Sequence, residues 1–294
     1  MRTRPEPADV ERLRQIVGER LGLHLEEVGD DALVELLRRC VEANPPLGVG
    51  RYLDRLSSPA ATRELGALAV ELTVGETYFF RDPDQLRAFA EVVLVEPRVE
   101  RILSAGCASG EEAYTLAILA RERASASILG IDVNPAMIAK ARRARYSPWS
   151  LRQTSDEIRA RCFRQAGREY TIDPAIRDLV SFEVRNLVDE DAELWRPGSF
   201  DVVFLRNVTM YFSRERTRAV MTRVARALRP GGYLFLGHAE SLRAISDDFE
   251  LQNTHGTFYY RRRPPTAPAR LTPPSPPIAT PISIPIPIPI PIPI

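Results

Sequence analysis

Two candidate binding features stand close together in the middle of the chain: a turn of small residues and an acid beyond it. The turn, residues 106–110, has a glycine at each end and separates a short apolar run from residues with helical spacing, so the backbone can approach a ligand closely. Asp132 lies near the end of the next apolar run. In a nucleotide-binding sheet, an acid at the tip of the second strand accepts hydrogen bonds from both ribose hydroxyls. Alternatively, Asp132 caps the helix that begins at Pro135, although Asn134 is better placed as that cap.

The spacing of the two glycines limits which nucleotide-binding motif the turn can represent. It reads G-x-x-x-G, not the G-x-G-x-x-G of dinucleotide-binding folds, and no Lys-Ser or Lys-Thr pair follows as a P-loop requires. A strand, a glycine turn and a helix open a nucleotide-binding α/β unit, where ligands bind at the carboxyl ends of the strands. A glycine turn alone can also be a plain connection, so other residues must decide.

Polar side chains at two further places could meet a ligand. Arg81 follows an aromatic run, and a guanidinium beside aromatic rings needs a partner. Arg206 and Asn207 come directly after the apolar run 200–205, which suits a strand covered on both faces, so they fall at its carboxyl end. Tyr211 follows in the loop before the next helix. The aromatic run and Tyr211 can also be ordinary apolar packing.

His238, Glu240 and Ser241 invite comparison with a hydrolase triad. We reject this interpretation because the nucleophile-elbow turn is missing and the three residues are adjacent on one predicted loop. The chemistry-bearing residues as a group show no evident general base.

Apolar periodicity predicts the elements that must position these residues. Strands are expected at 102–103, 127–133, 200–205, 233–237 and 249–262, with helices over 85–93, from 111 on, 135–146 and 214–228. Residues 147–185 break this rhythm, since 161–164, 169–172 and 180–184 alternate like short antiparallel strands. Four helices are expected before residue 75, over 10–17, 30–37, 49–56 and 57–72. The expected fold class is α/β.

The composition argues against several classes of function. The 294 residues hold 40 Lys+Arg against 39 Asp+Glu, so there is no electrostatic case for binding nucleic acid. The three cysteines are few and scattered, which argues against a disulfide framework and fits a reducing cytosol. The charged N-terminus lacks the apolar core of a signal peptide, and no 18-residue apolar run exists for a membrane span. We expect a cytoplasmic protein with no membrane insertion and no metal.

Four sequence blocks resemble the CheR family of chemotaxis methyltransferases, in that family's order and spacing. They are residues 72–82 (LTVGETYFFRD), 104–112 (SAGCASGEE), 200–212 (FDVVFLRNVTMYF) and 228–242 (LRPGGYLFLGHAESL). The resemblance implies a Rossmann-like class I methyltransferase sheet within a domain over 76–262, with a small antiparallel β-subdomain inserted at 158–184. It also implies an all-helical N-terminal domain over 1–75. The Pro-rich residues 263–294 are expected to form a disordered tail, extended like polyproline II because proline lacks a backbone donor.

In that family the cofactor is S-adenosylmethionine, and receptor glutamates become methyl esters with S-adenosylhomocysteine as the other product. By resemblance, Arg81 and Tyr211 stand at the methyl-transfer site. The implied cofactor-binding residues are Gly75, Thr77, Arg81, Gly106, Glu112, Asp132, Asn186, Leu187, Arg206 and Asn207. Asn186 and Leu187 would border the adenine, and Glu112 or Glu111 would face the amino-acid or ribose end. Gly75 stands where family members often have asparagine, so one cofactor contact is lost there or supplied by Glu76.

The partner that the resemblance implies is the cytoplasmic helical bundle of a methyl-accepting chemotaxis receptor, with the protein acting as a monomer. Arginines recur on the predicted N-terminal helices: Arg12, Arg20, Arg38, Arg39, Arg51 and Arg55. They form either solvated helix faces or a basic surface for an acidic receptor. Some family members bind a pentapeptide tether through a longer loop in the β-subdomain. The short connection 165–169 predicts recognition without a tether.

Two other functions stay open at this point. A catalytically inactive CheR-like module would bind S-adenosylmethionine or a receptor without methyl transfer, and Gly75 is the one feature that favours it. A small-molecule methyltransferase of the same fold would not explain the helical segment and the inserted strands. The tail either binds a partner or is dispensable. Retention of Arg81, Asp132, Arg206, Asn207 and Tyr211 together favours the protein-glutamate methyltransferase.

Overall fold

The structure, a computed structural model, describes residues 5–96, 98–121 and 126–264. Contacts gather the chain up to Pro264 into one compact unit. The predicted Pro-rich tail lies outside the described residues from position 265 on. No helix in the described part of the chain is long and apolar enough to cross a membrane.

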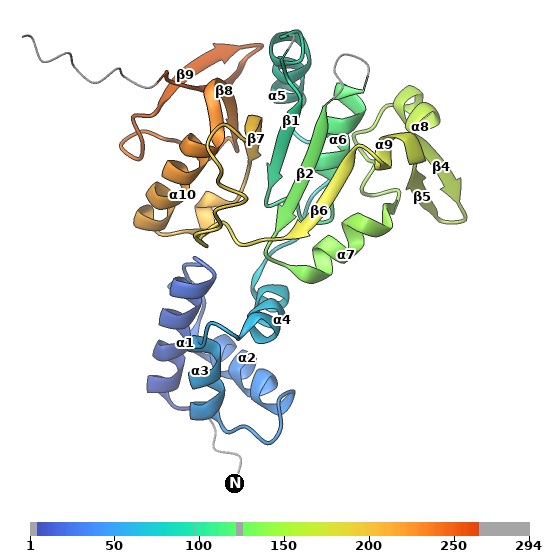
Figure 1. Ribbon diagram of the computed structural model, residues 1–294. Coiled ribbons are helices and arrows are strands. Elements are labelled where there is room, and N and C mark those ends of the chain that lie inside the picture. Colours follow the sequence, from blue (N-terminus) through green and yellow to red (C-terminus); the bar gives the residue numbers. More distant parts are fainter. Residues whose placement is uncertain (1–4, 97, 122–125, 265–294) are drawn as a thin grey trace, which may run out of the picture. The chain divides into compact units, whose positions relative to one another are not determined.

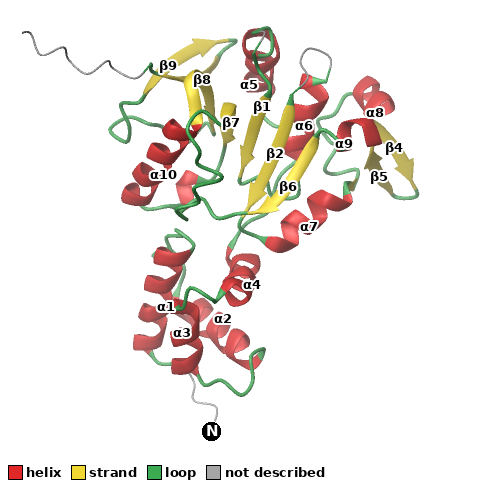
Figure 2. Cartoon of the chain, viewed as in Figure 1, coloured by secondary structure: helices red, strands yellow, loops and turns green. Residues whose placement is uncertain are grey.

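Four helices in the N-terminal part share a core of their own (Figures 1 and 2). They are α1 (Pro7–Arg20), α2 (Asp30–Glu42), α3 (Val49–Ser57) and α4 (Thr62–Leu72). The predicted face of α1, with Val10, Leu13 and Val17, is buried, and so is the leucine face of α2. Spacings of three and four residues place these side chains on one side of each helix. The four predicted helices are confirmed.

A 7-stranded sheet carries the rest of the chain, in the order β6-β2-β1-β7-β8-β10-β9 (Figure 1). Its strands are β1 (Arg101–Ala105), β2 (Ser127–Asp132), β6 (Val180–Val184), β7 (Phe200–Leu205), β8 (Leu228–Leu236), β9 (Phe249–Thr254) and β10 (Thr257–Arg262). The pairs from β6 to β8 are parallel, whereas β10 is antiparallel to both β8 and β9. The predicted class I methyltransferase sheet is confirmed.

Helices cover this sheet through two separate apolar cores. The elements are α5 (Pro83–Ala88), η1 (Phe89–Val93), α6 (Glu111–Ala120), α7 (Pro135–Arg143), α8 (Asp156–Cys162), α9 (Pro174–Arg177), η2 (Thr209–Tyr211) and α10 (Arg214–Ala227). Successive residues of a strand point to opposite faces. Ile102 and Phe204 therefore join the core that includes η1, α6 and α7, while Leu103 and Val203 join the core that includes α10.

The predicted antiparallel insertion is correct for two of its strands and wrong for the third. β3 (Arg145–Tyr146), β4 (Phe163–Ala166) and β5 (Glu169–Ile172) form a 3-stranded antiparallel sheet. Residues 180–184, which we expected in that insertion, form β6 and pair in parallel with β2 in the main sheet. β6 is an edge strand in which only Phe182 is buried. Exposure of one face produces the alternation that suggested an antiparallel strand.

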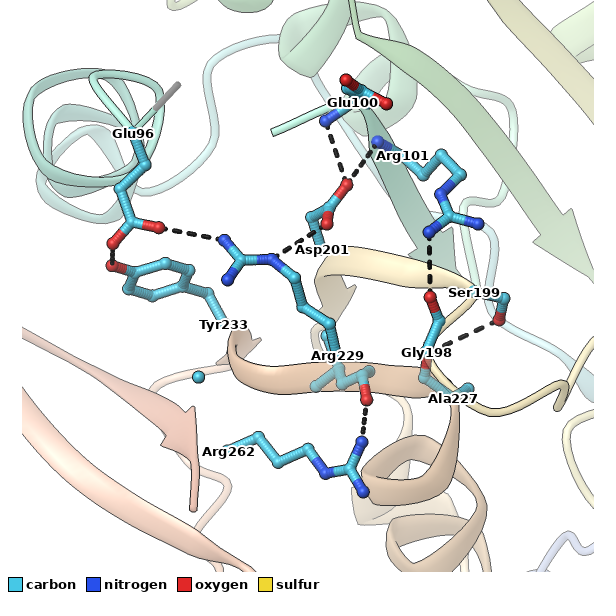
Figure 3. Close-up of polar contacts among 12 residues, drawn as sticks. Glu96, Glu100, Arg101, Gly198, Ser199, Asp201, Ala227, Arg229, Tyr233 and Arg262 are labelled. Carbon is cyan, nitrogen blue, oxygen red and sulfur yellow. Dashed lines mark hydrogen bonds and ion pairs between the residues drawn. The ribbon is translucent and has the colours of Figure 1, made fainter. Parts of the chain in front are cut away.

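Carboxylate and guanidinium groups connect the amino-terminal ends of neighbouring strands, at the edge of the sheet opposite the glycine turn (Figure 3). Asp201 on β7 accepts hydrogen bonds from the backbone N–H groups of Glu100 (3.0 Å) and Arg101 (2.9 Å). Arg229 donates its Nε–H to the other Asp201 oxygen at 2.9 Å and pairs with Glu96 at 2.9 Å. Tyr233 donates to Glu96 at 2.5 Å. These contacts join the segment that enters β1 to strands β7 and β8.

We expect Asp201→Ala to lower the free energy of unfolding by about 3 kcal/mol, measured by urea denaturation. The Asp201 side chain is 6% exposed, and its removal leaves Arg229 and two backbone donors without their acceptor. Ser199→Ala is the matched control, because the Ser199 hydroxyl makes only 3.5 Å hydrogen bonds with described residues, and its loss should change stability by less than about 0.5 kcal/mol. Equal stability of both variants would contradict the role given to Asp201.

Candidate functional site

A pocket lies at the carboxyl ends of β1, β2 and β7, the edge where ligands bind in sheets of this kind. Its wall includes the glycine turn after β1, the segment 72–78 between α4 and α5, and residues 185–187 and 206–208. The structure brings every predicted site residue to this one pocket. They are Gly75, Thr77, Arg81, Gly106, Glu112, Asp132, Asn186, Leu187, Arg206, Asn207 and Tyr211.

The glycine turn has no room for a side chain at its first position. Gly106 has φ +74°, and a Cβ atom there would lie 2.3 Å from Val208 Cγ2. The N–H groups of Gly106 and Cys107 donate to the carbonyl of Ile131 at 2.8 and 2.9 Å. The turn is therefore fixed between the end of β2 and the loop after β7, with its backbone exposed to the pocket.

Asp132 is held at the tip of β2 by backbone donors. Its Oδ2 accepts from the N–H of Ala108 at 2.9 Å, and its Oδ1 accepts from the N–H of Asn134 at 2.8 Å. Burial raises the pKa of Asp132, and the backbone N–H groups oppose this shift. The Asn134 side chain caps α7, which confirms the predicted cap. An ionised carboxylate has about four acceptor positions, which leaves Asp132 capacity for a ligand.

Arg206 lies at the centre of a buried ion cluster. Its side chain is 3% exposed and pairs with Asp82 and, at 3.3 Å, with Glu112. Ser104 also donates to Glu112 at 2.7 Å. Burial raises the pKa of Glu112, and the charge of Arg206 opposes that shift. In the described part of the chain, Arg206 Nε has no hydrogen-bond partner, so this buried donor is available to a bound molecule.

Arg81 and Tyr211, the predicted transfer residues, line the same pocket with uncommitted polar groups. The Arg81 guanidinium lies 5.8 Å from the centre of the Tyr78 ring, and its half-buried side chain makes no ion pair with a described residue. Tyr211 is 40% exposed. Its backbone carbonyl accepts from His24 at 2.8 Å, but its hydroxyl group has no partner among the described residues. Both side chains can therefore meet a substrate without first breaking an internal contact.

Strained backbone concentrates around this pocket. Phe80, Asp82, Ala108 and Asn207 adopt positive φ values between 45° and 61°. Such conformations cost about 1–3 kcal/mol each and persist where the surrounding contacts fix them, typically at functional sites. All four flank or line the pocket, which supports its assignment as the working site of the molecule.

Gly75, the departure from the family pattern, lies beside a flexible side chain. A Cβ atom at Gly75 would lie 2.7 Å from the sulfur of Met137, which also lines the pocket. The flexible end of Met137 on α7 thus lies in the space that a side chain at position 75 would enter. The glycine packs against this neighbour in the pocket wall.

Asn186 differs from its predicted role in one respect. Its Nδ2 group donates to the backbone carbonyl of Arg20 at 2.7 Å, and its Oδ1 accepts from the N–H of Val188 at 3.3 Å. The amide that was expected to read the adenine edge is thus already bonded within the protein. Leu187 beside it is buried and lines the pocket.

Several pocket residues were missed by the sequence analysis. Leu21 and Leu23, at the end of α1 and beyond it, line the pocket, and Leu23 pairs with Phe212 in an isolated β-bridge. Outside the pocket wall, Arg152 lies over two rings, 3.7 Å from the centre of Tyr78, which lines the pocket, and 4.4 Å from the centre of Trp149. No local pattern could have found Leu23, because its bridge partner Phe212 lies far away in the sequence.

The sequence is similar to a known protein family and to proteins that carry that family's name. A family model described as the SAM-binding domain of CheR methyltransferases matches residues 75–258. The chain belongs to the CheR methyltransferase family. A chemotaxis protein methyltransferase 1 of Pseudomonas aeruginosa is 31% identical, with 87% of this chain and 98% of that protein covered. A chemotaxis protein methyltransferase of Campylobacter jejuni is 30% identical, with 87% and 97% covered.

A further relative is much longer than this chain. An uncharacterized 104.1 kDa protein of Rhodobacter capsulatus, from the hypE 3′ region, is 36% identical over 232 residues. The match takes in 74% of this chain but spans only 24% of that protein. CheR-type sequences therefore also occur as one part of a longer chain.

The residues of this CheR-family pocket fit S-adenosylmethionine. Asp132 keeps acceptor capacity for the two ribose hydroxyls, and Leu187 and Ile131 offer apolar surface to a base. The close approach at Gly106 suits a ligand that lies against the backbone. The buried Nε–H of Arg206 is a donor that a carboxylate can satisfy. No group of residues able to hold a metal ion occurs within the described ranges.

We expect Gly106→Ala to destabilise the protein and to abolish binding of S-adenosylhomocysteine, as measured by calorimetry. The left-handed φ costs about 1–2 kcal/mol for a residue with Cβ, and the overlap with Val208 adds about 1–3 kcal/mol of overpacking. Gly167→Ala is the matched control: Gly167 has φ +66° but no atom within 4 Å of the added Cβ. Its free energy of unfolding should fall by the backbone strain alone, and it should bind S-adenosylhomocysteine as tightly as the unaltered protein. Normal binding by Gly106→Ala would contradict the close approach.

We expect binding of S-adenosylhomocysteine to weaken as the pH falls through the raised pKa of Asp132. The ionised carboxylate accepts from the ribose hydroxyls, whereas the protonated form loses acceptor capacity, so binding gains strength above that pKa and loses it below. Titration calorimetry at a series of pH values measures this. Asp132→Asn should bind weakly with a flatter pH profile, any remaining slope reporting Glu111 and Glu112, whose pKa values burial also raises. An unchanged profile would remove Asp132 from the ribose site.

Proposed function

We propose that this protein transfers the methyl group of S-adenosylmethionine to glutamate side chains of chemotaxis receptors, giving glutamate methyl esters and S-adenosylhomocysteine. Membership of the CheR family and the names of two full-length relatives support this activity. The observation that carries the proposal is that Arg81 and Tyr211 line one pocket together with the predicted cofactor residues, and that the guanidinium of Arg81 and the hydroxyl of Tyr211 make no ion pair or hydrogen bond with a described residue.

The chemistry needs no general base, and the pocket is built accordingly. S-adenosylmethionine supplies a methyl group already activated on a sulfonium. A glutamate side chain, with an ordinary pKa of about 4.3, is ionised at neutral pH and can attack that methyl directly. No histidine stands among the described residues that line the pocket, and the Asp132 and Glu112 carboxylates are bonded within the protein.

The protein's task is then to align the substrate carboxylate. Orientation of reacting groups can supply up to about 7–11 kcal/mol of a barrier. Arg81 positions the carboxylate, and Tyr211 orients it or the methyl group. Charge disappears as the carboxylate meets the sulfonium, so a very strong pairing in the ground state would oppose the reaction. Arg81, which is half-buried beside the Tyr78 ring, would attract the substrate carboxylate only moderately.

Five of the six predicted arginines of the helical segment are engaged within the protein, and Arg51 alone is exposed without a partner among the described residues. Arg12 pairs with Asp54, and Arg39 with Glu71. The other engaged ones are Arg38 with Glu35 and Glu42, Arg55 with Glu64, and Arg20 with the carbonyls of Leu56 and Ser58. These contacts favour the interpretation as solvated helix faces. We therefore propose that the receptor bundle is recognised by shape and local contacts more than by a cationic field.

The short β4–β5 connection supports recognition without a C-terminal tether on the receptor. The two strands face each other from Phe163–Ile172 to Ala166–Glu169, so the turn holds only Gly167 and Arg168. We propose a monomer in the cytoplasm as the working form. The alternative, an inactive binding module, rests on Gly75 alone, which packs against Met137 in the pocket wall.

The test is incorporation of labelled methyl from S-adenosylmethionine into cytoplasmic receptor fragments, followed by release of volatile label in base. Base-labile label is expected, because a methyl ester hydrolyses to methanol whereas an N-methyl group does not. Cofactor binding without label in any receptor would favour the binding module. Absence of cofactor binding would overturn the proposal.

We expect Arg81→Ala to lower kcat for receptor methylation by about a hundred-fold while S-adenosylhomocysteine still binds, because alignment of the carboxylate is lost. Arg87→Ala is the matched control, since Arg87 lies on the neighbouring helix α5, is exposed, and among the described residues forms an ion pair only with Asp84. That variant should turn over normally. Near-normal turnover by Arg81→Ala with bound cofactor would remove this mechanism.

A further inference from the structure

The carboxylate of Glu240 accepts hydrogen bonds from every backbone N–H group of residues 207–210. Glu240 follows β8 and was part of the rejected triad. Its Oε1 accepts from the N–H groups of Val208 (2.9 Å), Thr209 (2.7 Å) and Met210 (3.3 Å) and from Thr209 Oγ1 (2.8 Å). Its Oε2 accepts from the N–H groups of Asn207 (2.8 Å) and Gly237 (2.7 Å). Successive backbone donors of this kind form an anion-binding nest, here filled by the protein's own side chain.

The loop that Glu240 holds carries two of the pocket's ligand-facing residues. Asn207 opens it in a left-handed conformation, φ +57°, and Tyr211 closes it at the end of η2. The loop belongs to no strand or long helix, so its backbone donors would otherwise go unpaired, at a cost for each buried group. Hydrogen bonds to a charged acceptor are about twice as strong as neutral ones, so the carboxylate fixes the loop firmly.

Glu240 is packed closely between Gly237 and the loop after β7. A Cβ atom at Gly237 would lie 2.9 Å from both Glu240 Oε2 and Asn207 Nδ2. On the other side, Val208 rests against Gly106 of the cofactor turn. The carboxylate thus sets the distance between the loop after β7 and the glycine turn after β1.

We propose that Glu240 is a positioning residue for methyl transfer, which places Asn207 against the cofactor and Tyr211 at the transfer site through its grip on residues 207–210. This inference rests on the proposed function for its effect on turnover. Glu240 itself takes no part in proton transfer, because both of its oxygens are occupied by backbone donors. The triad interpretation stays excluded.

Glu240→Gln tests the role of these hydrogen bonds with little change in side-chain volume. An amide oxygen in the place of Oε1 keeps the bonds to residues 208–210, whereas an amide NH₂ in the place of Oε2 opposes the N–H groups of Asn207 and Gly237. We expect about ten-fold weaker binding of S-adenosylhomocysteine and about ten-fold lower kcat. Ser241→Ala is the matched control, because the one hydrogen bond that Ser241 Oγ makes with a described residue is accepted from Arg243 N at 3.2 Å. It should leave both quantities unchanged.

A double-mutant cycle separates positioning from general stability. If Glu240 acts through the loop, Glu240→Gln should lower kcat by less than about two-fold in a Tyr211→Phe background, and should weaken cofactor binding little in an Asn207→Ala background. Equal losses in all backgrounds would overturn the inference. Should the protein methylate no receptor, the cofactor-binding cycle with Asn207→Ala still decides it. Failure of the proposed function is thereby distinguishable from failure of this one.

Discussion

The site depends on one buried cation. Arg206 directly follows strand β7, which is buried at every position, and its side chain is almost completely buried. A charge in that setting requires opposite charges, which come from Asp82 before α5 and from Glu112 on α6. The three groups therefore join segments from three distant parts of the sequence. Replacing such a cluster with apolar residues would not reduce stability by itself, so its value here lies in fixing one arrangement of the pocket wall.

A buried contact between a carboxylate and a guanidinium group lies at each end of β7. At its start, Asp201 accepts two backbone donors and meets Arg229, and beyond its end Arg206 meets two carboxylates. The first contact joins the segment that enters β1 to strands β7 and β8. The second faces the ligand edge of the sheet, where connecting loops have few apolar contacts of their own. Carboxylates bonded to backbone N–H groups, Asp132 and Glu240, do there what apolar packing does in the cores.

Much of the fold and the membership of the pocket could be predicted from the sequence. The apolar runs and glycine turn located the strands, and parallel topology then brings their carboxyl ends to one edge, so Asp132, Arg206 and Asn207 had to meet. The assignment of 180–184 failed because an edge strand and an antiparallel strand expose one face alike. The ion pair of Asp82, the bridge of Leu23 and the hydrogen bonds of Glu240 to residues 207–210 could not be predicted, because each depends on a partner distant in the chain. The amide of Asn186 was likewise committed to Arg20 by tertiary contact.

The contact between Gly75 and Met137 has a consequence for the pocket wall. The thioether lies in the volume that a side chain at position 75 would enter. Because methionine is unbranched and adaptable, a side chain added at position 75 would displace the thioether by a rotamer change of Met137. The two positions are therefore coupled, and the residue at 75 sets where the polarizable sulfur sits in the pocket wall.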